Sequence, residues 1–132
     1  MTSARTRLLV VVAAFVCVVV IGTLGFLALD QQSAIQCTLE WGRLAPFPTS
    51  AEQFSITTEG NMFTRGFHAS FTARPAEIEQ WLQQSPGTRE ASPTTPATGI
   101  RHFQIAPGGG AQRAEVTVDG TTNRVSIYVS WS

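Results

Sequence analysis

The sequence predicts a single N-terminal transmembrane helix followed by a small α+β domain, in which one helix packs on an antiparallel sheet. Three observations support this prediction. An unbroken apolar stretch covers residues 8–29, and residues 75–84 carry apolar side chains at helical spacing. The other apolar segments alternate with a period of two, as strands with one buried face do. Strands grouped around one helix are typical of an α+β domain.

The apolar stretch, residues 8–29, is long enough to cross a bilayer. At about 1.5 Å per residue it makes a helix of roughly 33 Å, which matches a hydrocarbon core of about 30 Å. Arg5 and Arg7 precede it, and Asp30 is the first charged residue after it. The positive-inside rule therefore places residues 1–7 in the cytoplasm and the domain outside. A cleaved signal sequence has a shorter apolar region, so we expect a retained anchor.

Length limits the size of the domain, and charge limits the kinds of partner it is expected to bind. The chain has 132 residues, with nine arginines and nine carboxylates. Two of the arginines precede the apolar stretch, so the rest of the chain has a formal charge of −2. This charge argues against nucleic acid or an anionic membrane surface as the main partner. The length allows a single modest core.

The segment after the apolar stretch predicts a short spacer and a first strand. Residues 30–34 are expected to be the spacer, and residues 35–132 the domain, held close to the bilayer. Residues 35–41 alternate, with Cys37 on the apolar side, and predict a strand. Cys17 lies in the apolar stretch, so no disulfide can form within the domain. The strand pattern favours a buried Cys37 thiol, and an exposed thiol that links two copies is the alternative.

The rest of the domain alternates between strand patterns and turns rich in Gly, Asn and Pro. A short amphipathic helix with Ile78, Trp81 and Leu82 on one side is expected to lie across the sheet and bury Trp81. Residues 88–98, rich in Thr and Pro, predict a mobile surface loop. Strands are expected at residues 53–58, 63–73, 100–105, 114–118 and 124–131. The aromatic residues expected in the core are Trp41, Phe63, Phe67, Phe71, Trp81, Phe103 and Trp131.

No motif in the chain specifies a catalytic centre. A Gly-x-Ser-x-Gly frame is absent, and Glu77 and Glu79 fall on different sides of their helix. His68 and His102 are the only side chains with an ordinary pKa near neutral pH, and both fall on the polar side of predicted strands. No short spacing of metal-ligand types supports a metal site. We therefore expect a protein that is not an enzyme and holds no metal or cofactor.

An interaction surface is predicted instead. The run of three glycines leads into a strand, so it predicts a flexible turn rather than a phosphate loop. Beside residues 88–98, this turn would make a recognition edge. The last predicted strand carries Tyr128 on its polar side, and it would pair with a partner strand if it lies at an edge of the sheet. The residues assigned to this surface are Tyr128, Gly108, Gly109, Gly110, His68 and His102.

These observations predict a single-pass protein of the bacterial cell envelope. It would present a small extracytoplasmic interaction domain, as an accessory or scaffold subunit, outside the cytoplasmic membrane. Lipid would surround residues 8–29, a protein would bind the domain, and nucleic acid is not an expected partner. One alternative is an extracytoplasmic ligand- or metal-binding sensor domain, which needs His68 and His102 close together. A small hydrolase is a further and less favoured alternative.

Overall fold

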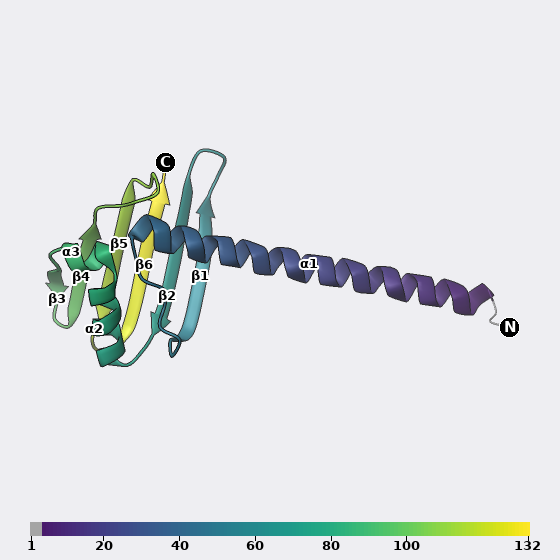
Figure 1. Cartoon of the computed structure of the whole chain (residues 1–132), viewed down its shortest axis with the longest axis horizontal. Coiled ribbons are helices and arrows are strands. Elements are labelled where there is room, and N and C mark those ends of the chain that lie inside the picture. The colour runs from purple at the N-terminus through teal and green to yellow at the C-terminus, as the bar shows by residue number, and fades with distance from the viewer. Residues whose placement is uncertain (1–3) are drawn as a thin grey trace. The chain divides into compact units, whose positions relative to one another are not determined.

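The computed structural model describes residues 4–132, except for the side chain of Leu27. The chain divides into an N-terminal unit that ends at Ser33 and a compact domain, Ala34–Ser132. Helix α1, Ala4–Gly42, contributes its first part to the N-terminal unit and its last residues to the domain (Figure 1). The first three residues of the predicted cytoplasmic segment, residues 1–7, lie outside the described part of the chain.

In the N-terminal unit, α1 exposes apolar side chains on all sides. Leu8, Phe15 and Ile21 are among its exposed residues, and no side chain of its most apolar window is buried. In the described part of the chain, α1 is the only helix that is long and apolar enough to cross a membrane, judged by length and composition. The predicted apolar helix over residues 8–29 is therefore confirmed as a helix and as a candidate membrane span.

The prediction of a strand at residues 35–41 is wrong, because α1 continues to Gly42. Residues 30–34, expected as a spacer, are helical as well. Ala34 and Thr38, four residues apart, are both buried, and the Thr38 hydroxyl donates a hydrogen bond to the Ala34 carbonyl at 2.8 Å. A segment this short satisfies both a strand period and a helix period, and packing against the domain selects the helix.

The domain is built on a six-stranded antiparallel sheet with the order β1-β2-β6-β5-β4-β3. Strands β1 and β3 form its edges, and β6 lies between β2 and β5 (Figure 1). The last strand therefore does not lie at an edge, which was the condition for its pairing with a partner strand. The strands are β1 Glu52–Gly60, β2 Arg65–Thr72, β3 Thr94–Ala97, β4 Ile100–Ile105, β5 Arg113–Asp119 and β6 Arg124–Trp131.

Two short helices connect β2 to β3: α2, Pro75–Gln84, and α3, Pro86–Glu90. The predicted helix at residues 75–84 is confirmed, but the prediction of a mobile loop at residues 88–98 is wrong. That segment contains the end of α3 and the strand β3. The buried Thr88 hydroxyl donates to the Leu82 carbonyl at 2.7 Å, which ties α3 to α2. Pro96 is tolerated in β3 because β3 is an edge strand.

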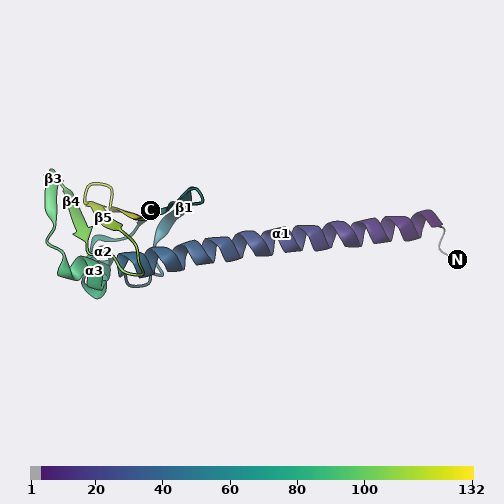
Figure 2. The ribbon, with the colours of Figure 1, turned by 90° about the horizontal axis from the view of Figure 1, so that it is seen from above.

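The core lies between one face of the sheet and the helical residues of the domain, which all cover that face (Figure 2). Trp81 is 2 % exposed, as expected, and its indole N–H donates to the Ala45 carbonyl at 3.0 Å. Its ring centroid lies 5.4 Å from that of Phe71. Phe63 and Trp131, which were expected in the core, are exposed instead. Phe63 precedes β2, which begins at Arg65, so it does not share the buried side of that strand.

Candidate interaction surface

The face of the sheet opposite the helices, called the open face below, carries polar side chains across its central strands. His68 pairs with Tyr128 between β2 and β6, and Tyr128 pairs with Glu115 between β6 and β5. Glu115 in turn pairs with Gln104 of β4. These side chains therefore form a row across four strands. A neighbouring row, also set by the register, consists of Ser70, Ser126, Thr117 and His102.

Tyr128 lies at the centre of the open face, between a histidine and an arginine. Its ring centroid is 4.4 Å from that of His68, and the two planes meet at 32°. The Cζ atom of Arg113 is 5.5 Å from the centroid of the Tyr128 ring. Tyr128 is half-buried. Contacts with the two neighbouring side chains fix the position of a large aromatic ring that solvent can still reach.

Two glutamates extend this group along the face. The His68 Nε2 atom lies 3.3 Å from Glu59 of β1, and Arg113 lies 3.1 Å from Glu115. Glu115 is also 3.3 Å from His102 Nε2, and the other ring nitrogen of His102 is 3.2 Å from the Thr117 hydroxyl. The open-face cluster, as we call it, consists of Glu59, His68, Tyr128, Arg113, Glu115 and His102.

The two histidines share the open face but do not meet. His68 lies on β2 and His102 on β4, with β6 and β5 between them. Three strand spacings of about 4.8 Å separate the two strands by roughly 14 Å. Each histidine contacts a different glutamate. Within the described residues, no three His, Cys, Asp or Glu side chains are grouped to hold a metal ion. The geometry therefore does not supply the shared site that the sensor alternative needs.

Two of the three glycines predicted at a recognition edge, Gly108 and Gly109, pack against the end of α1. The Gly108 N–H donates to the Trp41 carbonyl at 2.9 Å. That carbonyl is among the last four of the helix, which lack a partner within the helix. Gly109 has a φ of +61°, and a Cβ atom there would lie 2.6 Å from the Trp41 ring. The turn thus packs closely against the end of α1, and this contact explains the glycines at positions 108 and 109.

The interaction surface predicted from the sequence does not include three members of the open-face cluster: Glu59, Arg113 and Glu115. The only available signal was that Glu115 alternates with buried residues in its strand. That pattern places its side chain on the polar side but says nothing about which strands are neighbours. The contacts with His68 and His102 follow from the sheet order and register.

A cavity of about 390 Å³ lies at the end of the sheet next to Tyr128. Gly66 lines it, and a Cβ atom at this position would lie 3.0 Å from the Glu59 carboxylate. The cavity combines hydroxyl, charged and aromatic groups beside the open-face cluster. Its lining residues are Glu59, Gly60, Thr64, Arg65, Gly66, Tyr128, Ser130, Trp131 and Ser132.

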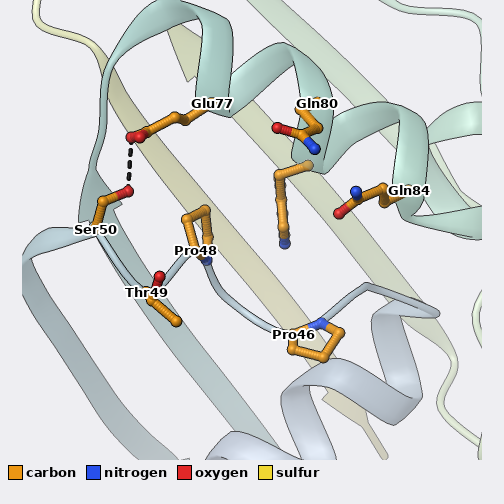
Figure 3. Close-up of a pocket in the computed structure, with 8 residues that line it drawn as sticks. Pro46, Pro48, Thr49, Ser50, Glu77, Gln80 and Gln84 are labelled. Carbon is orange, nitrogen blue, oxygen red and sulfur yellow. Dashed lines mark hydrogen bonds between the residues drawn. The ribbon is translucent and has the colours of Figure 1, made fainter.

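A smaller cavity, of about 200 Å³, lies between α2 and residues 46–50, on the helix side of the sheet (Figure 3). The Ser50 hydroxyl donates to Glu77 at 2.7 Å and closes one end. This bond, followed by that from Arg74, lowers the pKa of the Glu77 carboxyl. Gln80 and Gln84 line the same side of the cavity as Glu77 (Figure 3). The bond holds residues 46–50 against α2.

Cys37 lies on the domain part of α1 and is half-buried. Burial is the largest cause that raises the pKa of its thiol, followed by the charge of Glu40, and Arg65 opposes both. A raised pKa keeps the thiol protonated and lowers its reactivity. The environment of Cys37 is therefore that of a packing residue, on a helix rather than on the predicted strand.

The fold and the surface define a class of protein: an α+β domain, with one uncovered sheet face, that follows a candidate membrane-spanning helix. No family model, curated protein or solved structure matches the chain. The open face and the apolar helix are therefore the features from which its function can be inferred.

Proposed function

We propose that this protein is a single-pass membrane protein that binds another protein through the open face of its domain. Residues 1–7 would lie in the cytoplasm, residues 8–29 in the cytoplasmic membrane, and the domain outside, in the bacterial cell envelope. The protein would act there as an accessory or scaffold subunit rather than as an enzyme. The observation that carries the proposal is the ordered cluster around Tyr128 on an uncovered sheet face.

The apolar helix supports the membrane part of the proposal. Between Leu8 and Leu29, the side chains that the structure describes are exposed, and apolar ones lie on all sides of the helix. A helix of this kind needs an apolar environment, which a bilayer supplies. Arg5 and Arg7 before the stretch, with Asp30 as the first charge after it, favour a cytoplasmic N-terminus.

The composition of the open face supports binding to a protein. Tyrosine and arginine are the residue types most often found at the energetic centre of interfaces. Tyr128 and Arg113 already contact each other, so little side-chain freedom would be lost on binding. Six strands about 4.8 Å apart, at about 3.3 Å per residue, form a face of roughly 600 Å². This area approaches the value of about 800 Å² per partner in a standard interface.

Site-specific photo-crosslinking tests the proposal. Tyr128 is replaced by photoreactive benzoylphenylalanine in the full-length protein, which is produced in its native cells and illuminated in intact membranes. The matched control carries the same group at Gln83, an exposed residue of α2 on the helix side of the domain. Adducts are recovered by affinity purification and identified by mass spectrometry.

We expect one protein to be crosslinked from position 128 and not from position 83. The Tyr128→Ala variant, treated with a chemical crosslinker, should lose the same partner. The proposal is overturned if position 128 gives no adduct, or if both positions give the same set of proteins.

A further inference from the structure

The hairpin that joins β1 to β2 exposes two large apolar side chains at its tip. Met62 is 87 % exposed and Phe63 is 74 % exposed. Outside α1, the described chain has one other exposed large apolar residue, Trp131, at 44 %. All three lie at the same end of the sheet, because Arg65 pairs with both Gly60 and Trp131 (Figure 1).

The turn itself holds these side chains outward. The Asn61 N–H donates to the Thr64 carbonyl at 3.0 Å, and the Phe63 N–H donates to the Asn61 side chain at 2.8 Å. Gly60 has a φ of +118°, which allows the chain to turn here. Met62 and Phe63 therefore stand at the apex of an ordered turn. Such tips are ordinarily polar, and contiguous exposed apolar residues mark sites that contact a protein or a membrane.

The base of the hairpin lies on the side of the domain that contains the last residues of α1, where the chain enters the domain at Ala34. The rings of Phe67 in β2 and Trp41 in α1 have centroids 5.3 Å apart. Arg65, two residues before Phe67, is close enough to Cys37 for its positive charge to act on the pKa of the thiol. Cys37 lies one helical turn after Ala34, the first residue of the domain. The hairpin and the entry point of the chain are thus neighbours within the domain.

The chain length then limits how far this side can lie from a membrane. Leu29 is the last residue of the apolar stretch, and the domain begins at Ala34. The segment between them spans about 7.5 Å as a helix and at most about 18 Å fully extended. A bilayer around residues 8–29 therefore keeps the entry side of the domain within this distance of its surface.

We propose that Met62, Phe63 and Trp131 insert into the headgroup region of the bilayer that residues 8–29 cross. Aromatic residues are enriched at this depth, where an apolar ring can leave water. The contact is apolar, so it requires no anionic lipid, in agreement with the net charge of −2 after the apolar stretch. Together with α1 it would give the domain two points of attachment and fix which way the open face is presented. This inference rests on the proposed membrane anchoring.

Spin labels on the full-length protein test the insertion. In a Cys17→Ala, Cys37→Ala background, a single cysteine is placed by Met62→Cys or Phe63→Cys, both at exposed positions of the turn. The matched control, Thr121→Cys, lies in the exposed turn between β5 and β6 at the opposite end of the sheet. The labelled proteins are reconstituted in phosphatidylcholine vesicles. Accessibility of each label to oxygen, which prefers lipid, is compared with accessibility to a water-soluble nickel chelate.

We expect the labels at positions 62 and 63 to favour oxygen and the label at position 121 to favour the nickel chelate. Water exposure at positions 62 and 63, or lipid exposure at all three positions, overturns the inference. An alkaline carbonate wash of the same vesicles tests the anchoring separately. Protein that resists the wash while position 62 lies in water leaves the anchoring intact and removes only the insertion. Protein that washes off overturns both.

Discussion

The two faces of the sheet are made by the same strands, yet their side chains differ in kind. In β6, Val125, Ile127 and Val129 are buried on the helix face, and Ser126 and Tyr128 alternate with them on the open face. The helix face holds rings and branched side chains in contact with α2. The open face holds ion pairs and hydroxyl groups that solvent still reaches. A period of two thus lets each strand stabilise the fold with one set of residues and present another set to a partner.

The largest effect is expected on the helix face. Trp81→Ala removes a fully buried ring and its hydrogen bond to Ala45. We expect it to lower the free energy of unfolding by about 3–5 kcal/mol, a large share of the stability of a small domain. Urea denaturation of the full-length protein in detergent micelles, followed by tryptophan fluorescence, measures the change. Thr117→Ala, on the open face, is the control and should cost less than about 1 kcal/mol. Equal losses would contradict the division between the faces.

An intermediate effect on stability is expected at the centre of the open face. Tyr128→Ala removes the ring that contacts His68 and Arg113. Because the ring is only half-buried, we expect the free energy of unfolding to fall by about 1–2 kcal/mol. Tyr128→Phe keeps the ring and should leave stability nearly unchanged. The same denaturation series measures both. A loss at Tyr128 as large as that at Trp81 would show that the open face is part of the core.

The smallest effect concerns the ionisation of Glu77, beside α2. Its pKa is lowered, first by the hydrogen bond from Ser50 and then by that from Arg74. A lowered pKa means that the ionised form stabilises the folded state. This contribution is present above the carboxyl pKa of the unfolded chain, about 4.3, and is lost as pH falls through the folded value.

Glu77→Gln removes this contribution. The melting temperatures of the two proteins should differ near neutral pH and converge on acidification. The difference should be small, because the partner Arg74 is largely exposed to solvent. Ser50→Ala should reproduce most of the effect, and the double variant should add little to it. A constant difference across the acid range would show that the Glu77 charge does not matter.

Much of the domain could be predicted from local patterns. The strand at residues 124–131 alternates over its whole length, and the turn at Asp119 and Gly120 places its partner. The helix at residues 75–84 begins at a proline and carries its apolar residues on one side. In each case a single segment contains the whole signal, so no knowledge of distant residues is needed.

The wrong predictions lie where a distant contact decides the local structure. Residues 35–41 fit either period, and burial of Ala34 and Thr38 against the domain selects the helix. Residues 88–98 have loop composition, but pairing with β4 makes Thr94–Ala97 a strand. The candidate surface follows the same rule. Tyr128, His68 and His102 could each be placed on a polar side, whereas their glutamate and arginine neighbours depend on the strand order.

The sequence by itself determined the apolar helix, the α+β class and the side of its strand on which each polar residue lies. These features follow from composition and periodicity along short segments. The tertiary structure alone decided that β6 is central and that Gly108 and Gly109 pack against the end of α1. It also decided that Met62 and Phe63 stand exposed at a hairpin tip. The physical reason is that strand order and helix packing bring together residues far apart in the chain, and no local pattern encodes which ones will meet.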